Sequence, residues 1–143
     1  MIVASILNTK GREVRSVPAD MNVRDAARFL HAHRIGAAVV LNGRGGPAGV
    51  FSERDLLTAI AEQGASALAL TVAELMSSNV PVCAPEDTID HVMATMTDRR
   101  VRHLPVVANG VAIGVISIGD VVKSRIAEAE TEASALKAYI ASG

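Results

Sequence analysis

Hydrophobic positions recur along the chain in the same order twice. Val23, Ala26, Ala27 and Leu30 have the i, i+3, i+4, i+7 spacing that puts apolar side chains on one face of a helix, and an apolar run at 37–41 predicts a strand after it. The helical spacing returns 66 residues later, followed by a run at 104–107. The later helix positions are Ile89, Val92, Met93 and Met96. The sequence therefore predicts an internal duplication.

Each copy is predicted to have the element order β-α-β-β-α after a short helical turn. Neither small sheet covers its own apolar face, so the α+β fold should pack the two copies sheet to sheet. We expect the first unit at 1–64, a surface linker at 65–71, the second unit at 72–126 and a helical extension at 127–143. The predicted elements are helical turns at 3–8 and 72–77, extended pieces at 14–18 and 80–84, second hairpin strands at 48–51 and 111–116, and closing helices from Ser52 and Ser117.

The last helix continues into an apolar seam with steps of four and three residues. This heptad-like spacing is typical of helices that contact another helix. Two interpretations stay open: the helix packs back on its own domain, or it forms a contact between two copies of the chain. The seam consists of Val122, Ile126, Ala129, Ala133, Leu136 and Ile140.

One motif, Gly-hydrophobic-x-Ser-x-x-Asp, occurs at 49–55 and again at 114–120. Its simplest interpretation is a capping box that stabilises the start of a helix by about 1 kcal/mol. A helix start also offers free N–H groups to anions, and a carboxylate one turn into the helix can accept hydrogen bonds from ribose hydroxyls. Two copies of the motif in a duplicated fold favour a nucleotide-binding role.

The segments 49–55 (GVFSERD), 102–107 (RHLPVV) and 114–120 (GVISIGD) resemble cystathionine-β-synthase-type (CBS) domains. The resemblance covers nearly the whole chain and implies a tandem CBS pair, or Bateman module, with pseudo-twofold symmetry and two clefts. It further implies a regulatory sensor that binds AMP, ADP, ATP or an NAD-like adenosyl compound and responds by conformational or dimer rearrangement. No obligatory cofactor and no catalytic residue are expected.

By position, the resemblance implies that the two motif aspartates hold ribose hydroxyls and the two motif serines contact ribose or phosphate. Basic residues of either copy would bind phosphate, and small or apolar residues would line the adenine pockets. The first copy has Gly36 where the second has Arg102, and Arg54 is matched by Gly119, so each cleft is expected to draw on both copies. The implied binding residues are Val17, Pro18, Ala37, Ser52, Arg54, Asp55, Cys83, Ala84, Arg102, His103, Leu104, Ser117 and Asp120. For His103 a purely structural role stays equally open.

Composition narrows the function classes. Fourteen basic and fifteen acidic residues with only three aromatic ones argue against nucleic-acid binding. The single cysteine fits a reducing compartment, the histidines form no tight metal-ligand cluster, and no apolar run approaches a membrane span, so a cytoplasmic protein is expected. The glycine-rich stretch 43–48 lies between two strands, which argues against a dinucleotide fingerprint.

Three function classes follow from these observations. A nucleotide-sensing homodimer that signals to an effector protein is favoured over a ligand-free interaction module acting through its C-terminal helix. An enzyme is disfavoured, because the sequence has no recognisable pairing of a nucleophile with a base.

Overall fold

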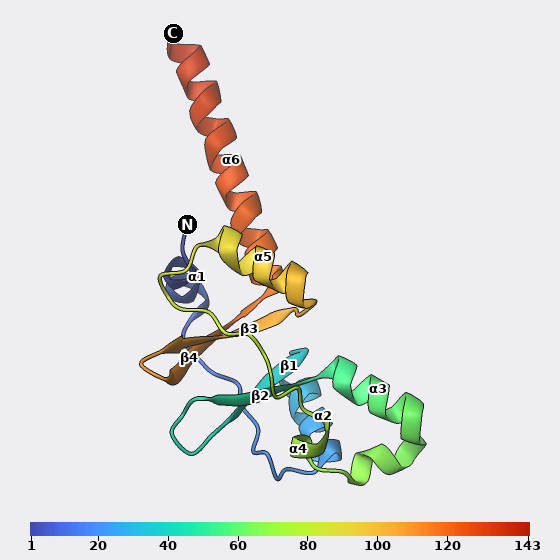
Figure 1. Cartoon of the computed structure of the whole chain (residues 1–143). Coiled ribbons are helices and arrows are strands. Elements are labelled where there is room, and N and C mark those ends of the chain that lie inside the picture. Colours follow the sequence, from blue (N-terminus) through green and yellow to red (C-terminus); the bar gives the residue numbers. More distant parts are fainter.

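The computed structural model describes residues 1–143 and confirms the duplicated α+β architecture. Two antiparallel hairpins lie side by side in the middle of the molecule, and helices cover their outer faces (Figure 1). The elements in chain order are α1 Val3–Lys10, α2 Val23–His33, β1 Ala37–Leu41, β2 Pro47–Ser52, α3 Glu53–Gln63, the 3-10 helix η1 Gly64–Ala69, α4 Val72–Leu75, α5 Ile89–Arg99, β3 His103–Ala108, β4 Val111–Ser117 and α6 Ile118–Ser142.

The two hairpins have matching registers. Ala37 pairs with Ser52 in the first hairpin, and His103 pairs with Ser117 in the second. Each hairpin therefore places the first residue of its leading strand beside the serine that caps the following helix. The predicted extended pieces at 14–18 and 80–84 are reduced to single parallel bridges, at Ser16 and at Cys83, so the first β of each unit is one bridged residue.

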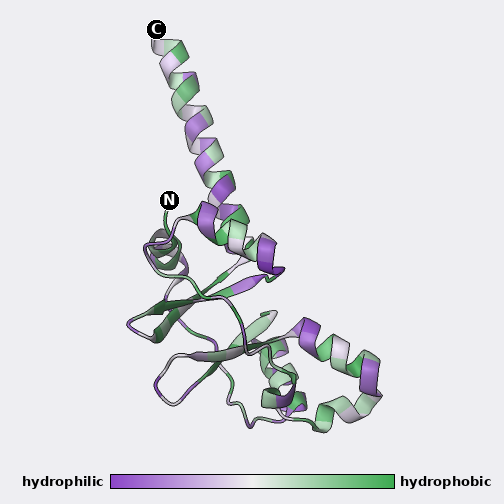
Figure 2. Ribbon diagram, in the orientation of Figure 1, coloured by the Kyte–Doolittle hydropathy of each residue, from purple (hydrophilic) through white to green (hydrophobic).

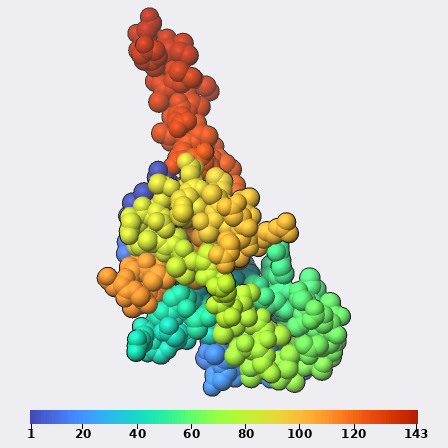
Figure 3. Space-filling view, in the orientation of Figure 1, coloured from blue at the N-terminus to red at the C-terminus, as the bar shows by residue number.

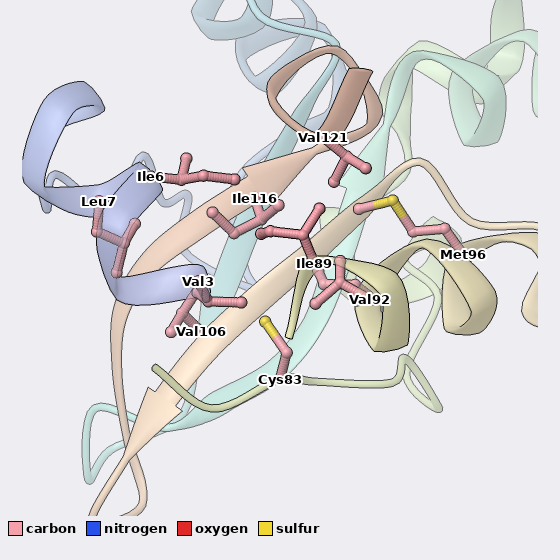
Figure 4. Packing of buried hydrophobic residues seen from close by; sticks show 11 residues of the cluster. Val3, Ile6, Leu7, Cys83, Ile89, Val92, Met96, Val106, Ile116 and Val121 are labelled. Atoms are coloured by element: carbon pink, nitrogen blue, oxygen red, sulfur yellow. The ribbon is translucent and has the colours of Figure 1, made fainter. Parts of the chain in front are cut away.

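Alternation along the strands gives each hairpin two buried faces. In β1, Ala38 and Val40 enter the core beside α2, whereas Val39 lies on the opposite face and is still 1% exposed. The second half has its own aliphatic core around Leu104, Val106 and Ile116, in which helix side chains pack on β3 and β4 (Figure 4). With few aromatic residues available, both cores are filled mainly by branched aliphatic side chains.

The two halves exchange their leading helices. Val3, Ile6 and Leu7 of α1 belong to the core of the second half, and the Val3 amide donates to the Asp87 carbonyl at 2.9 Å. Reciprocally, Val72 of α4 lies in the core of the first half. Each hydrophobic core therefore includes side chains from a helix of the other repeat. The unit boundaries proposed from the sequence stay predictions.

The segment between the copies lies largely at the surface, as expected, but it is helical rather than an irregular loop. Residues 64–69 form the η1 helix, and within it the Ala67 side chain alone is fully buried. Gly64, with a positive φ of 69°, turns the chain out of α3.

The C-terminal helix does not pack back on its own domain. Its first turns are held against the second half by buried Val121 and Ser124, and every residue from 129 to 143 is exposed. The helix projects from the body as an isolated rod with mixed polar and apolar residues (Figures 2 and 3). Of the two interpretations of its seam, the one that buries the seam within the same chain is therefore contradicted.

Candidate functional site

Both Ser-x-x-Asp motifs form capping boxes where a hairpin strand runs into a helix. The Ser52 amide donates to the Asp55 carboxylate at 2.9 Å, and the Asp55 amide donates back to the Ser52 hydroxyl at 3.3 Å. Ser117 and Asp120 make the same reciprocal pair at 2.9 and 3.1 Å. These contacts confirm the structural interpretation of the motif and fix each carboxylate beside a strand end.

The first cleft has a volume of about 490 Å³ and lies between α3 and the second half. The N-terminal turn of α3 supplies Ser52, Arg54 and Asp55, and the segment before β3 supplies residues 100–103. Polar groups from both halves therefore meet here, as the sequence predicted for the basic residues. Its full lining is Gly36, Val50, Ser52, Glu53, Arg54, Asp55, Leu57, Ser77, Val80, Arg100, Val101, Arg102 and His103.

The second cleft is the pseudo-symmetric counterpart and is smaller, at about 340 Å³. Residues 34–37 occupy the place that residues 100–103 hold in the first cleft, and Ser117 takes the place of Ser52. Gly36 stands where the first cleft has Arg102, so this cleft lacks the arginine side chain at that position. Its lining is Lys10, Gly11, Glu13, Arg15, Arg34, Ile35, Gly36, Ala37, His103, Val115 and Ser117.

The two motif carboxylates have different surroundings: Asp55 lines the first cleft, whereas Asp120, the other carboxylate expected to hold ribose, lines neither cleft. Asp55 Oδ1 accepts only one long contact, from the Ser77 hydroxyl at 3.4 Å. Asp120 Oδ2 accepts a charged hydrogen bond from Lys10 Nζ at 2.6 Å. Burial alone would raise the pKa of Asp120, but the hydrogen bonds from Lys10 and Ser117 outweigh it and hold that pKa below its ordinary value.

His103 lines both clefts and is half-buried at the start of β3. Burial lowers the pKa of this imidazole, and the positive charge of Lys10 lowers it further, against the opposing effect of Glu53 and Asp120. The neutral ring is favoured in the ligand-free protein, and an anion bound beside it would favour the protonated ring.

Five residues implied for the adenine pockets line neither cleft. The side chains of Val17, Cys83 and Leu104 are at most 5% exposed, because the two cores use them. Pro18 and Ala84 also lie outside both linings, and the Ala84 amide is already bound to the Asp87 carboxylate. The expected pocket role of these side chains is therefore not supported.

The structure confirms that Cys83 is a buried thiol. Its side chain belongs to the core of the second half (Figure 4). Burial, together with the nearby charge of Asp87, raises the pKa of this thiol to about 12, so the reactive thiolate form is disfavoured at neutral pH.

Several cleft residues were not identified from the sequence. Lys10 and Ser77 reach the clefts from the exchanged helical segments, which no local pattern reveals. Arg34 and Arg100, by contrast, are 66 residues apart, the same offset as the helices they end, and both have left-handed φ near 54°. The duplication contained a signal for this arginine pair that the motif-based reasoning did not use.

The fold and its two clefts define a module built from a pair of repeated α/β units. The family model described as "CBS domain" matches residues 3–62 and again residues 72–127. The chain therefore belongs to the CBS-domain family and contains a tandem pair, which confirms the resemblance seen in the sequence. CBS pairs are regulatory modules, and this class is the one that the fold supports.

Similar proteins agree with this assignment. The CBS domain-containing protein CBSX3, mitochondrial, of Arabidopsis thaliana is 33% identical over 99% of this chain and 72% of its own length. The crystal structure of the CBS-domain containing protein ATU1752 of Agrobacterium tumefaciens is 48% identical, with a TM-score of 0.83 over 87% of this chain and 92% of that one. The CBS pair of protein MJ0100, solved with 5′-methylthioadenosine and S-adenosyl-L-methionine, shares the fold at 21% identity, with a TM-score of 0.79 over 90% and 98% of the two chains.

None of the helices combines the length and apolarity needed to cross a membrane. The cytoplasmic location expected from the sequence stays a prediction, since the name of one relative places that relative in mitochondria.

Proposed function

We propose that the chain is a regulatory sensor that binds an adenine nucleotide in the first cleft. The observation that carries the proposal is the position of Asp55, whose carboxylate lines a cleft that also contains four basic side chains. This cleft combines an acceptor for a sugar diol with positive charge for phosphate. The basic side chains are Arg54, Arg100, Arg102 and His103.

The carboxylate of Asp55 is held in place yet keeps free acceptor capacity. Oδ2 accepts from the Ser52 amide and hydroxyl, at 2.9 and 3.0 Å, which fixes the side chain. Oδ1 has only the 3.4 Å contact with Ser77, so ribose hydroxyls would displace a weak partner. A positioned acceptor of this kind favours binding because little order is lost when the ligand arrives.

Apolar side chains give the base a place in the same cleft. Val50, Leu57, Val80 and Val101 line it, and no Phe, Tyr or Trp ring is present for stacking. The base would be held by aliphatic contacts and by backbone groups. The adenosyl ligands named for the MJ0100 pair, which has the same fold, support an adenosine compound as the ligand class.

Isothermal titration of AMP, ADP and ATP tests the proposal. Asp55→Asn should weaken binding about 10- to 100-fold, because it removes a charged acceptor of hydrogen bonds. Asp25→Asn is the matched control: Asp25 is also the third residue of a helix, α2, and lies in neither cleft. Equal binding by wild type and Asp55→Asn would remove the first cleft as the site.

We favour a sensor over a catalyst. No group of three or more His, Cys, Asp or Glu side chains is placed to hold a metal ion, and the half-buried carboxylate of Asp55 is engaged in a capping box. Signalling requires that the ligand bind one arrangement of the halves or protomers better than another. Turnover of ATP at stoichiometric protein would contradict this part of the proposal.

We also propose that the projecting part of α6 pairs with the same helix of a second copy. Leu136 and Ile140 are 59% and 68% exposed on one seam, and pairing of two such seams would remove this apolar surface from water. An effector protein remains the alternative occupant, and the ligand-free interaction module expected as an alternative would use the same surface.

The double variant Leu136→Glu/Ile140→Glu should convert a dimer into a monomer in light scattering after size exclusion. Ala138→Glu, with one added negative charge in place of two, puts glutamate on another face of the helix and should leave the mass unchanged. A wild-type protein that runs as a monomer at high concentration would contradict the pairing.

A further inference from the structure

We infer that Lys10 makes the two clefts unequal by covering Asp120, the counterpart of Asp55. Asp120 bonds to Lys10 and Ser117, which stand in the lining of the second cleft, but does not itself line it. This inference deepens the proposed function and rests on it for its ligand. Lys10 is the last residue of α1, which the chain exchanges into the second half. An N-terminal residue thereby determines what Asp120, 110 residues later, can recognise.

The contact is specific in geometry. Lys10 Nζ donates to Asp120 Oδ2 at 2.6 Å and also to the Val115 carbonyl at 2.8 Å. The Asp120 side chain is 21% exposed and the Lys10 side chain 40% exposed, so solvent still partly screens this ion pair. Two acceptors, on the second hairpin and on α6, therefore hold the ammonium group of a residue that lines the second cleft.

The equivalent place in the first cleft is not blocked in this way. There the partner is the neutral Ser77 hydroxyl, at 3.4 Å from Asp55 Oδ1. Asp55 lines the first cleft, so a ribose hydroxyl reaches its Oδ1 by displacing a weak neutral contact. Asp120 does not line the second cleft, and Lys10 and Ser117, which bond to its Oδ2, stand in the lining instead, so a ribose hydroxyl reaches Asp120 only if Lys10 moves. The first cleft should therefore fill first, and the second should be weaker by about two- to fivefold for this reason alone.

Lys10 is also the positive group that acts most strongly on the imidazole shared by the two clefts. His103 faces Lys10, Arg102, Glu53 and Asp120. Displacement of Lys10 from Asp120 would change the charge next to a residue that lines the first cleft. Occupation of one cleft can thus change the affinity of the other through the position of the Lys10 ammonium group, without a large movement of the halves.

Titration of AMP into four proteins tests the inference: wild type, Lys10→Met, Asp120→Asn and the double variant. Wild type should show one tighter and one weaker site, and Lys10→Met should strengthen the weaker site about two- to fivefold. Asp120→Asn alone should change the tighter site less than twofold, and in the double variant the gain should disappear. Lys123→Met, an exposed lysine with no ion pair, is the control for loss of charge.

The outcomes separate this inference from the proposed function. If Lys10→Met leaves the weaker site unchanged or weakens it, Lys10 does not block Asp120, and the proposal for the first cleft still stands. If wild type does not bind AMP but Lys10→Met binds it in an Asp120-dependent manner, the inference holds and the proposal for the first cleft fails.

A readout without ligand covers the remaining case, in which no protein binds AMP. The carboxyl carbon of Asp120, followed by NMR during acid titration, should show a higher pKa in Lys10→Met than in wild type, because the stabilising cation is gone. An unchanged Asp120 pKa would show that the contact does not persist in solution and would overturn the inference.

Discussion

At the scale of single residues, the two arginines that end α2 and α5 hold the backbone in a conformation that suits glycine. Arg34 and Arg100 have φ of 54° and 53°. A side chain costs roughly 1 kcal/mol in this region, so glycine would stabilise either position. Each position nevertheless carries an arginine, and each arginine lines one cleft. Backbone strain of this kind is often found at functional sites.

Arg100→Gly should therefore raise stability and lower affinity together. We expect the free energy of unfolding to increase by about 1 kcal/mol in urea denaturation, and nucleotide affinity in the first cleft to fall about two- to fivefold. Arg34→Gly is the matched control: it should give the same stability gain and leave the first cleft unchanged. A variant Arg100→Gly that is less stable than wild type would show that the arginine supports the fold.

At the scale of elements, the glycines of β2 and β4 mark where the exchanged helical segments cross the hairpins. A Cβ at Gly49 would lie 2.8 Å from the Ser77 carbonyl oxygen, which is fixed by its bond to the Val50 amide. A Cβ at Gly114 would meet only the Leu7 side chain, at 2.7 Å. The first obstacle is backbone in a hydrogen-bonded bridge, and the second is the end of a flexible side chain.

Gly49→Ala should consequently destabilise the protein more than Gly114→Ala. We expect about 1–3 kcal/mol for Gly49→Ala and less for Gly114→Ala, because Leu7 can change rotamer. Chemical denaturation of both variants checks the order. The reverse order would show that α1 is held more rigidly against β4 than the segment after α4 is held against β2.

Much of the element order could be predicted because it depends on local spacing. The apolar positions starting at Val23 and Ile89 locate α2 and α5, and the side chains of Asn22 and Thr88 cap these two helices. The linker was expected to be an irregular loop because its small residues suit one, whereas residues 64–69 are helical and bury Ala67. A heptad-like spacing shows that α6 has an apolar seam but does not say which surface the seam contacts, so the projection of this helix could not be predicted.

Prediction of the site was less complete, because part of the site depends on contacts between segments that are far apart in the sequence. The two Ser-x-x-Asp motifs are local, and both were placed correctly at helix starts. The pairing of Lys10 with Asp120 arises from an exchange of helices between the halves, so no pattern within a window reveals it. Val17 and Leu104 were assigned to pockets by position in the family, and the structure uses their side chains in the cores.

At the scale of the whole molecule, the first cleft exists only because the halves are paired. Its carboxylate belongs to α3 and its basic segment to the start of β3, and the exchanged helices tie the two halves together. A ligand that contacts both elements and binds one arrangement of the halves better would shift the halves toward that arrangement, and α6 continues directly from the second hairpin. This continuity gives a physical route from nucleotide binding to the projecting helix.

The most direct test of this account is a titration of the 15N-labelled protein with AMP, followed by amide chemical shifts. The account predicts that the first and largest shifts occur in the capping turn at 52–55 and in the segment 100–103, with smaller changes at 117–120 only at higher AMP. Largest shifts in any other part of the chain, or none at millimolar AMP, would contradict it.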